Sequence, residues 1–110
     1  MSQKDTVSPL LLTDVNTAAT AIDTWTAFSD GIEGACFMIR ITNDSDTDVY
    51  ISYDGSTRHE YVPSDESIEI SFQDNSSPGN GIAKLKKGTI LSVQGTAGTG
   101  LVYLSGYFNN

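Results

Sequence analysis

Residues 44–48 read Asp-Ser-Asp-Thr-Asp, and alternate carboxylates of this kind begin a calcium-binding loop, where they converge on one hard cation. The positions that make such a loop specific carry other residues, because Val49 stands sixth in place of Gly and Gly55 stands twelfth in place of Glu. The pattern therefore favours an acidic turn, and we predict no metal site and no cofactor. A weak calcium site shared with Asp54 stays open as the alternative.

Cys36 and His59 are the only cysteine and the only histidine, so nucleophilic catalysis of the Cys–His type would have to use this pair. No motif fixes a geometry between them. We expect His59 to be a surface residue beside Glu60. Cys36 is expected on the strand face opposite Phe37, Ile39 and Ile41, as a small buried side chain in a reducing compartment. We therefore predict that the protein is not an enzyme. A small hydrolase built on this pair is the least favoured alternative.

The Gly-rich segment Gly95–Gly100 (GTAGTG) resembles a phosphate-binding loop only superficially. It lacks the Lys-Ser/Thr end, and the residues after it, Leu101–Leu104, have the pattern of a strand. A phosphate loop needs a following helix whose N-terminus holds the anion. We predict a hairpin loop here.

Three aromatic residues, Trp25, Tyr50 and Tyr61, have the chemistry to stack on sugar rings if they are exposed. A carbohydrate-binding β-sandwich would present them as a flat row. The chain has five tyrosines spread over several predicted strands, so core and cross-strand packing explains most of them. Carbohydrate binding is therefore the alternative function.

The elements that must position these residues have the two-residue period of strands. Val, Ile, Thr, Tyr and Phe fill the patterned segments, and such side chains fit a half-buried pleated surface. No stretch shows a helical stripe. We predict an all-β, single-domain antiparallel β-sandwich of the jelly-roll or immunoglobulin-like type. The expected strands are 37–42, 49–53, 59–62, 68–72, a weaker one at 91–93, and 101–108, of which the last is expected to be central or covered on both faces.

Turn residues separate these strands. Asp54–Thr57 contains the Asp-Gly pair that favours a hairpin turn, since Gly tolerates a positive φ. The other expected turns and loops are 43–46, 75–81, 86–89 and 95–100.

The first thirty residues differ from the rest, and we divide the chain into residues 1–30, an N-terminal arm with a possible first strand, and the sandwich domain 31–110. Pro9 disfavours a helix start, and the apolar run that follows it would be costly to expose on a monomer. We predict that Val7–Val15 is an assembly arm ordered against a neighbouring subunit, with one or two further strands of the same sandwich as the equally weighted alternative. The predicted partner-binding residues are Leu10, Leu11, Leu12, Val15 and Trp25.

The charge balance excludes several partners. Six Lys and Arg against fourteen Asp and Glu give a net charge of −8, which disfavours both nucleic acid and anionic membranes as partners.

The longest aliphatic run, Leu10–Leu12, is far shorter than the about 20 residues of a membrane helix. The start MSQKD leads into no apolar core, so no signal peptide is expected.

The chain resembles the small all-β structural proteins of tailed-phage virions. The resembling parts are Gly34–Asp54 (GACFMIRITNDSDTDVYISYD), the hairpin to Tyr61, Lys86–Thr89 and Gly95–Tyr107. The resemblance implies a virion protein that decorates or stabilises the capsid or joins head components. It also implies assembly in the bacterial cytoplasm, the major capsid protein or another virion protein as partner, and a homo-oligomer, for which we expect a trimer.

Overall fold

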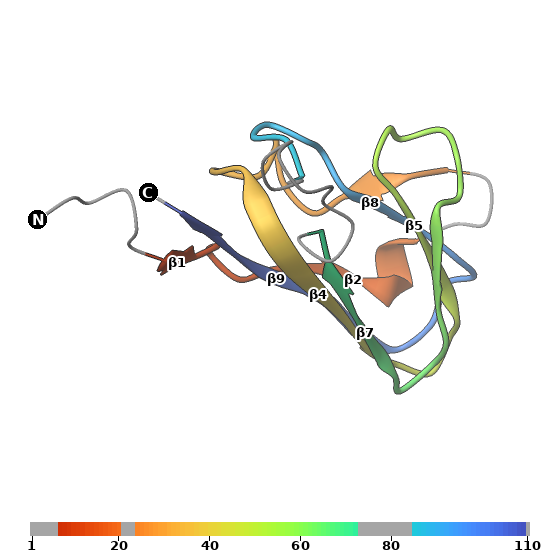
Figure 1. Ribbon diagram of the computed structural model, residues 1–110. Coiled ribbons are helices and arrows are strands. Elements are labelled where there is room, and N and C mark those ends of the chain that lie inside the picture. The colour runs from red at the N-terminus through yellow and green to blue at the C-terminus, as the bar shows by residue number, and fades with distance from the viewer. Residues whose placement is uncertain (1–6, 21–23, 73–84, 110) are drawn as a thin grey trace, which may run out of the picture.

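The computed structural model describes residues 7–20, 24–72 and 85–109 of the chain, and these form two antiparallel sheets with a single short 3-10 turn (Figure 1). The all-β prediction is confirmed, and the arrangement is compatible with a β-sandwich. The elements are β1 (Val7–Pro9), β2 (Thr13–Asn16), η2 (Thr17–Ala19), β3 (Thr26–Ala27), β4 (Cys36–Ser45), β5 (Val49–Ser52), β6 (Glu60–Val62), β7 (Ser67–Ser71), β8 (Ser92–Gln94) and β9 (Gly100–Asn109).

One sheet has five strands and the other has four. In the five-stranded sheet the order is β1-β9-β4-β7, and β2 also pairs with β9. The long β9 therefore holds two short strands along one edge, β1 on its last residues and β2 on Leu101–Leu104. The four-stranded sheet has the order β3-β8-β5-β6. The prediction that the C-terminal strand is central is confirmed, although Tyr107 on its outer face is exposed.

The core lies between the sheets, where alternate residues of β4 and β9 meet alternate residues of β5, β6 and β8. This is the expected consequence of the two-residue period, which sends every second side chain to the same face. The completely buried apolar side chains are Cys36, Ile39, Ile41, Val49, Ile51, Val62, Val93 and Val102.

A β-bulge corrects the predicted orientation of Cys36. The sequence pattern places Cys36 on the face opposite Ile39 and Ile41, but all three are buried on the inner face. The register between β4 and β9 shifts between Cys36 and Met38, so Phe37 is the extra residue and is only half-buried. One added residue inverts the alternation on its N-terminal side, which sequence period alone does not reveal.

The predicted turn at 43–46 is also wrong at its start, because β4 continues to Ser45. Asn43 and Ser45 pair with Val102 and Gly100 of β9, and both of their side chains are buried. Turn preferences of Asn and Ser are weak compared with a ladder of backbone hydrogen bonds on a central strand.

The segment before β9 is not a hairpin loop, because it connects strands of different sheets. β8 ends at Gln94 in the four-stranded sheet, whereas β9 begins at Gly100 in the five-stranded sheet. The Asp-Gly hairpin between β5 and β6 is confirmed, with Gly55 at a φ of 77°. The loop expected at 75–81 lies outside the described residues.

The first thirty residues contribute strands to both sheets: β1 and β2 to the five-stranded sheet, and β3 to the four-stranded sheet. This agrees with the alternative prediction, in which this segment forms further strands of the same fold. Leu10 is buried. Its backbone N–H donates to Gly106 O at 2.8 Å, and its side chain packs against Gly106, which has no side chain to occupy that space. Val15 is 4% exposed and pairs with Val102. Contact of Val7–Val15 with a neighbouring subunit stays a prediction.

The side chain of Asn43 joins the two sheets. Its Nδ2 donates to Val62 O of β6 at 3.0 Å and to Thr47 O in the following turn at 2.8 Å, and the residue is completely buried. Its Oδ1 accepts a hydrogen bond from the Ser45 hydroxyl. One amide thereby connects β4, the 46–48 turn and β6.

We expect Asn43→Ala to lower the free energy of unfolding by about 1–3 kcal/mol, because Val62 O and Thr47 O lose the hydrogen bonds that the buried amide donates, and Thr47 O keeps only the longer bond from the Ser45 hydroxyl. Urea denaturation measures this loss. The neighbouring exposed Asp44 provides the control, since Asp44→Ala should change stability by no more than about 0.5 kcal/mol. Equal losses for the two variants would contradict the role of the Asn43 amide.

Candidate functional site

The aspartates of the 44–48 segment hold backbone groups. Asp46 Oδ1 accepts from the backbone N–H of Thr99 at 2.8 Å, and Asp48 Oδ1 accepts from that of Ser64 at 2.9 Å. The two carboxylates thus brace different loops and do not converge. Within the described parts of the chain, no three His, Cys, Asp or Glu side chains are grouped so that they could hold a metal ion.

Asp54 organises the β5–β6 hairpin in the same way. Its Oδ1 accepts from the backbone N–H groups of Ser56 and Thr57, both at 2.9 Å, and from the Ser52 hydroxyl at 2.9 Å. These hydrogen bonds favour the charged form and hold the pKa of Asp54 well below its usual range, the backbone N–H of Ser56 having the largest effect. Oδ1 of this carboxylate therefore holds the turn together.

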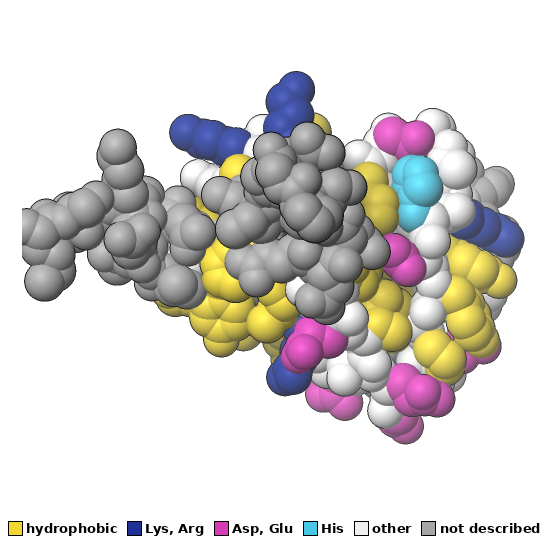
Figure 2. Space-filling view, in the orientation of Figure 1, with side chains coloured by type: hydrophobic (Ala, Val, Ile, Leu, Met, Phe, Trp, Pro, Cys, Tyr) yellow, Lys and Arg dark blue, Asp and Glu magenta, His cyan; other side chains and the backbone are white. Residues whose placement is uncertain are grey.

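His59 lies at the surface of this hairpin (Figure 2). Its Nδ1 accepts from the backbone N–H of Tyr53 at 3.0 Å, and its ring is 5.3 Å from the Tyr53 ring. Its Nε2 is 4.0 Å from Asp54 Oδ2, which is too long for a strong ion pair. In a catalytic histidine, one ring nitrogen binds a group that orients the ring. In His59 this nitrogen, Nδ1, instead accepts from Tyr53 and closes the hairpin.

Cys36 is completely buried, and its Sγ donates to Gly34 O at 3.6 Å. Burial, followed by the nearby charge of Glu33, raises the pKa of the Cys36 thiol to about 11. The thiolate is the nucleophilic form, so a thiol with this pKa is poorly suited to attack a substrate. The structure therefore gives the Cys36–His59 hydrolase no support.

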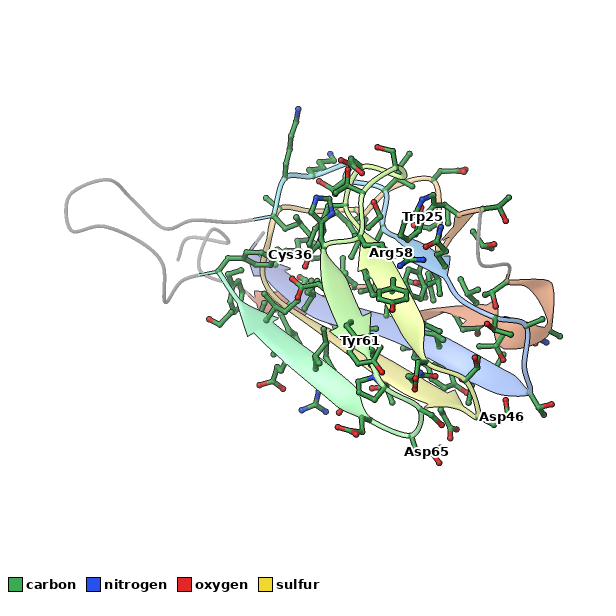
Figure 3. All side chains as sticks on the ribbon, turned by 90° about the vertical axis from the view of Figure 1, so that its right-hand side faces the viewer. Trp25, Cys36, Asp46, Arg58, Tyr61 and Asp65 are labelled. Atoms are coloured by element: carbon green, nitrogen blue, oxygen red, sulfur yellow. The ribbon has the colours of Figure 1, made fainter. Side chains whose placement is uncertain are left out.

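The outer face of the four-stranded sheet brings together the aromatic residues that the sequence separates (Figure 3). Tyr50 of β5 lies between Tyr61 of β6 and Gln94 of β8, and the two tyrosine rings are 5.4 Å apart. Trp25 precedes Thr26, which pairs with Val93, so Trp25 falls on the same face as Gln94. Tyr61 is 49% exposed, and Trp25 and Tyr50 are half-buried.

Arg58 completes this surface, and sequence reasoning missed it. Its guanidinium carbon lies 4.0 Å from the centre of the Tyr50 ring, and its Nε donates to Gln94 Oε1 at 2.7 Å. Figure 2 shows a basic side chain beside hydrophobic ones over this sheet. The Asp-Gly hairpin, which sets Tyr50 opposite Tyr61, is the sequence signal that could have located the surface. We call the residues Trp25, Tyr50, Arg58, Tyr61 and Gln94 the aromatic face.

The predicted partner-binding residues do not share one surface. Leu10 and Val15 are buried in the core of their own chain, and Trp25 belongs to the other sheet. Leu11 and Leu12 are 76% and 58% exposed at the edge of the five-stranded sheet. These two leucines are therefore the residues of the set that present the most apolar surface.

A cavity of about 230 Å³ opens beside Leu11, and its apolar lining comes from Leu10, Leu11, Ile32 and Leu104. The hydroxyl of Thr13, which also lines the cavity, is buried and has no hydrogen-bond partner among the described residues. The backbone N–H of Leu11 donates to Glu33 Oε1 at 2.7 Å and so ties the cavity's two walls together. We call Leu11, Leu12 and this cavity the N-terminal edge patch.

Comparisons with protein-family models, with curated proteins and with solved structures found no match. In the part of the chain that the structure describes, no helix is long and apolar enough to cross a membrane.

We expect iodoacetamide to label Cys36 very slowly in the native protein near neutral pH and rapidly in denaturant, because the thiol is buried and its pKa is raised. Mass spectrometry of samples with and without urea measures the two rates. Fast labelling of the native protein would show that Cys36 is accessible and reactive.

We expect the β5–β6 hairpin to keep its order when the pH falls through about 3.9, the usual pKa of an unfolded aspartate. A depressed folded-state pKa means that the stabilisation by Asp54 is present above the unfolded pKa and is lost only as the pH falls through the lower folded value. NMR shifts of the Ser56 and Thr57 amides against pH report this loss. The control Asp54→Asn should remove the titration, and a wild-type midpoint near about 3.9 would contradict the bracing role.

Proposed function

We propose that the protein is a non-enzymatic structural protein of a tailed-phage virion, which decorates or stabilises the capsid or joins head components through protein–protein contacts. The proposed partners are the major capsid protein or another virion protein, together with further copies of the chain, as a trimer. Assembly takes place in the bacterial cytoplasm, and the protein then remains on the particle. The finer fold type that goes with this role is a jelly-roll or immunoglobulin-like sandwich.

The N-terminal edge patch is the observation that carries the proposal. Two adjacent leucines are exposed at a sheet edge beside a partly apolar cavity, and clustered exposed apolar side chains are typical of surfaces that another protein covers. Covering each leucine contributes up to about 1.5–3 kcal/mol. Repeated over many copies, even a modest contact of this kind gives stable attachment through avidity.

The electrostatics support the same role. A net charge of −8 keeps the protein from binding the packaged DNA and from aggregating before assembly. The aspartates that provide much of this charge also brace the loops, as Asp46, Asp48 and Asp54 do. A rigid scaffold with short, braced connections loses little conformational entropy when it docks.

The test of this function is the composition of the particle. Mass spectrometry of purified virions from the phage that encodes the chain should detect the protein in many copies per particle. Its absence from intact virions, with the protein found only in the soluble lysate, would overturn the proposal.

We expect the double variant Leu11→Ser/Leu12→Ser to lose most of its self-association and its co-sedimentation with virions while its melting temperature changes little, because both side chains are exposed. Analytical ultracentrifugation measures self-association and co-sedimentation, and thermal melting checks that the variant is folded. Ile90→Ser is the matched control, since Ile90 is another exposed aliphatic residue, at 46%. Equal losses from the control would show that the N-terminal edge patch is not the contact.

A further inference from the structure

The aromatic face combines stacking surface with a fixed cation. Tyr61 is the most exposed ring of the face, Tyr50 lies beside it, and Trp25 extends the surface onto the region of β3 (Figure 3). Arg58 is held over the Tyr50 ring and by Gln94, so its guanidinium is oriented before any ligand arrives. Pre-organised donors of this kind lose little freedom on binding.

The charge of Arg58 is not neutralised within the described chain. Arg40 forms a salt bridge with Glu69 at 2.6 Å, whereas the recorded partners of Arg58 are the neutral groups of Tyr50 and Gln94. This is notable in a chain with fourteen acidic and six basic residues. A guanidinium has five N–H donors, and the bond to Gln94 uses only the Nε donor. The Nη groups therefore suit a carboxylate, which guanidinium binds with two parallel hydrogen bonds.

The shape of the face favours a saccharide. The cavities beside Leu11, Asp65 and Gly55 are lined by none of Trp25, Tyr50, Arg58 and Tyr61, so these four side chains form a surface separate from those cavities. The C–H groups on the flat side of a sugar ring carry partial positive charge, and the face of an aromatic ring carries negative charge. Rings on a sheet surface thus suit a sugar better than a peptide.

We propose that the aromatic face binds a carboxylated saccharide, with the sugar carboxylate on the Arg58 guanidinium and a sugar ring stacked on Tyr61. Asp48 lies at the other end of the face, where its carboxylate is close enough to the Tyr61 hydroxyl to raise the pKa of Tyr61. A carboxylate there would be repelled, whereas sugar hydroxyls can donate to Asp48. The ligand is therefore oriented with its acidic group toward Arg58.

The overall charge narrows the ligand class further. A chain of net charge −8 repels densely charged polymers such as sulfated polysaccharides. A single carboxylated sugar next to neutral sugars places one negative charge against one arginine and keeps the remaining ligand uncharged. Sialylated oligosaccharides, and oligosaccharides in which a uronic acid alternates with a neutral sugar, both have this pattern.

The chain's single tryptophan allows a direct experiment, because Trp25 lies in the face and its fluorescence reports binding there. Full-length protein is titrated with sialyllactose and a hyaluronan tetrasaccharide, with lactose as the neutral counterpart of sialyllactose and tetraglutamate as an acidic peptide. Amide NMR shifts around Tyr50 and Tyr61 locate the binding. The variants are Arg58→Gln and Tyr61→Ala, and Tyr107→Ala is the matched control, an exposed tyrosine on the other sheet.

We expect at least one carboxylated saccharide to bind, and lactose to bind about tenfold or more weakly, because it lacks the charge-assisted hydrogen bonds to Arg58. Arg58→Gln should remove this preference, and Tyr61→Ala should weaken every saccharide, while Tyr107→Ala leaves binding unchanged. Melting curves confirm that each variant is folded. The proposal is overturned if no carboxylated saccharide shifts these amides, if lactose binds equally well, if Tyr107→Ala has the same effect, or if tetraglutamate binds as tightly. These results are independent of whether the protein is found in virions.

Discussion

One buried amide forms a hydrogen bond from one sheet to the other, through the apolar core that they share. Asn43 lies in β4 of the five-stranded sheet, yet it donates to Val62 of β6 in the other sheet and to the turn that connects them. Its burial is tolerable because its donor and acceptor groups are all used, and an unmatched amide in the same place would be costly. The core between the sheets is apolar and non-directional, so the Asn43 amide, together with the Ser64 hydroxyl that donates to Ser45 O at 2.6 Å, fixes how β6 and its Tyr61 lie over β4.

Besides giving the chain its negative charge, several aspartates stabilise its turns. Asp46 and Asp48 each accept from a backbone N–H of a neighbouring loop, and Asp54 accepts from two in its own turn, which satisfies donors that tight turns would otherwise leave open. A high aspartate content is thus compatible with short, ordered connections. The carboxylates of Asp46 and Asp48 point to different loops and so do not converge on one ion, whereas Arg58 keeps donors for an external group.

The sequence predicted the strands well because their signal is local, and it failed where pairing over long distances decides the outcome. Alternation identified β4, β5, β7 and β9, and the Asp-Gly pair identified the hairpin at Gly55. The bulge at Phe37 and the continuation of β4 through Asn43 depend on registration against β9, and the route from Gln94 to Gly100 depends on which sheet each strand joins. Of the candidate sites, Tyr50 and Tyr61 were recognisable by type, but the stacking of Arg58 depends on the folded hairpin.

The two proposed surfaces belong to different sheets, and this separation has a physical consequence. The N-terminal edge patch lies along β1, β2 and β9, whereas the aromatic face lies over β3, β8, β5 and β6. A chain that docks through the first sheet can therefore leave the outer face of the second sheet accessible. Single sugar contacts on an open sheet are weak, because little of the ligand is buried. Many copies held on one particle convert such contacts into firm attachment, since each bound site raises the effective concentration at the next. Under the two proposals, assembly through one sheet would make weak saccharide binding by the other sheet useful.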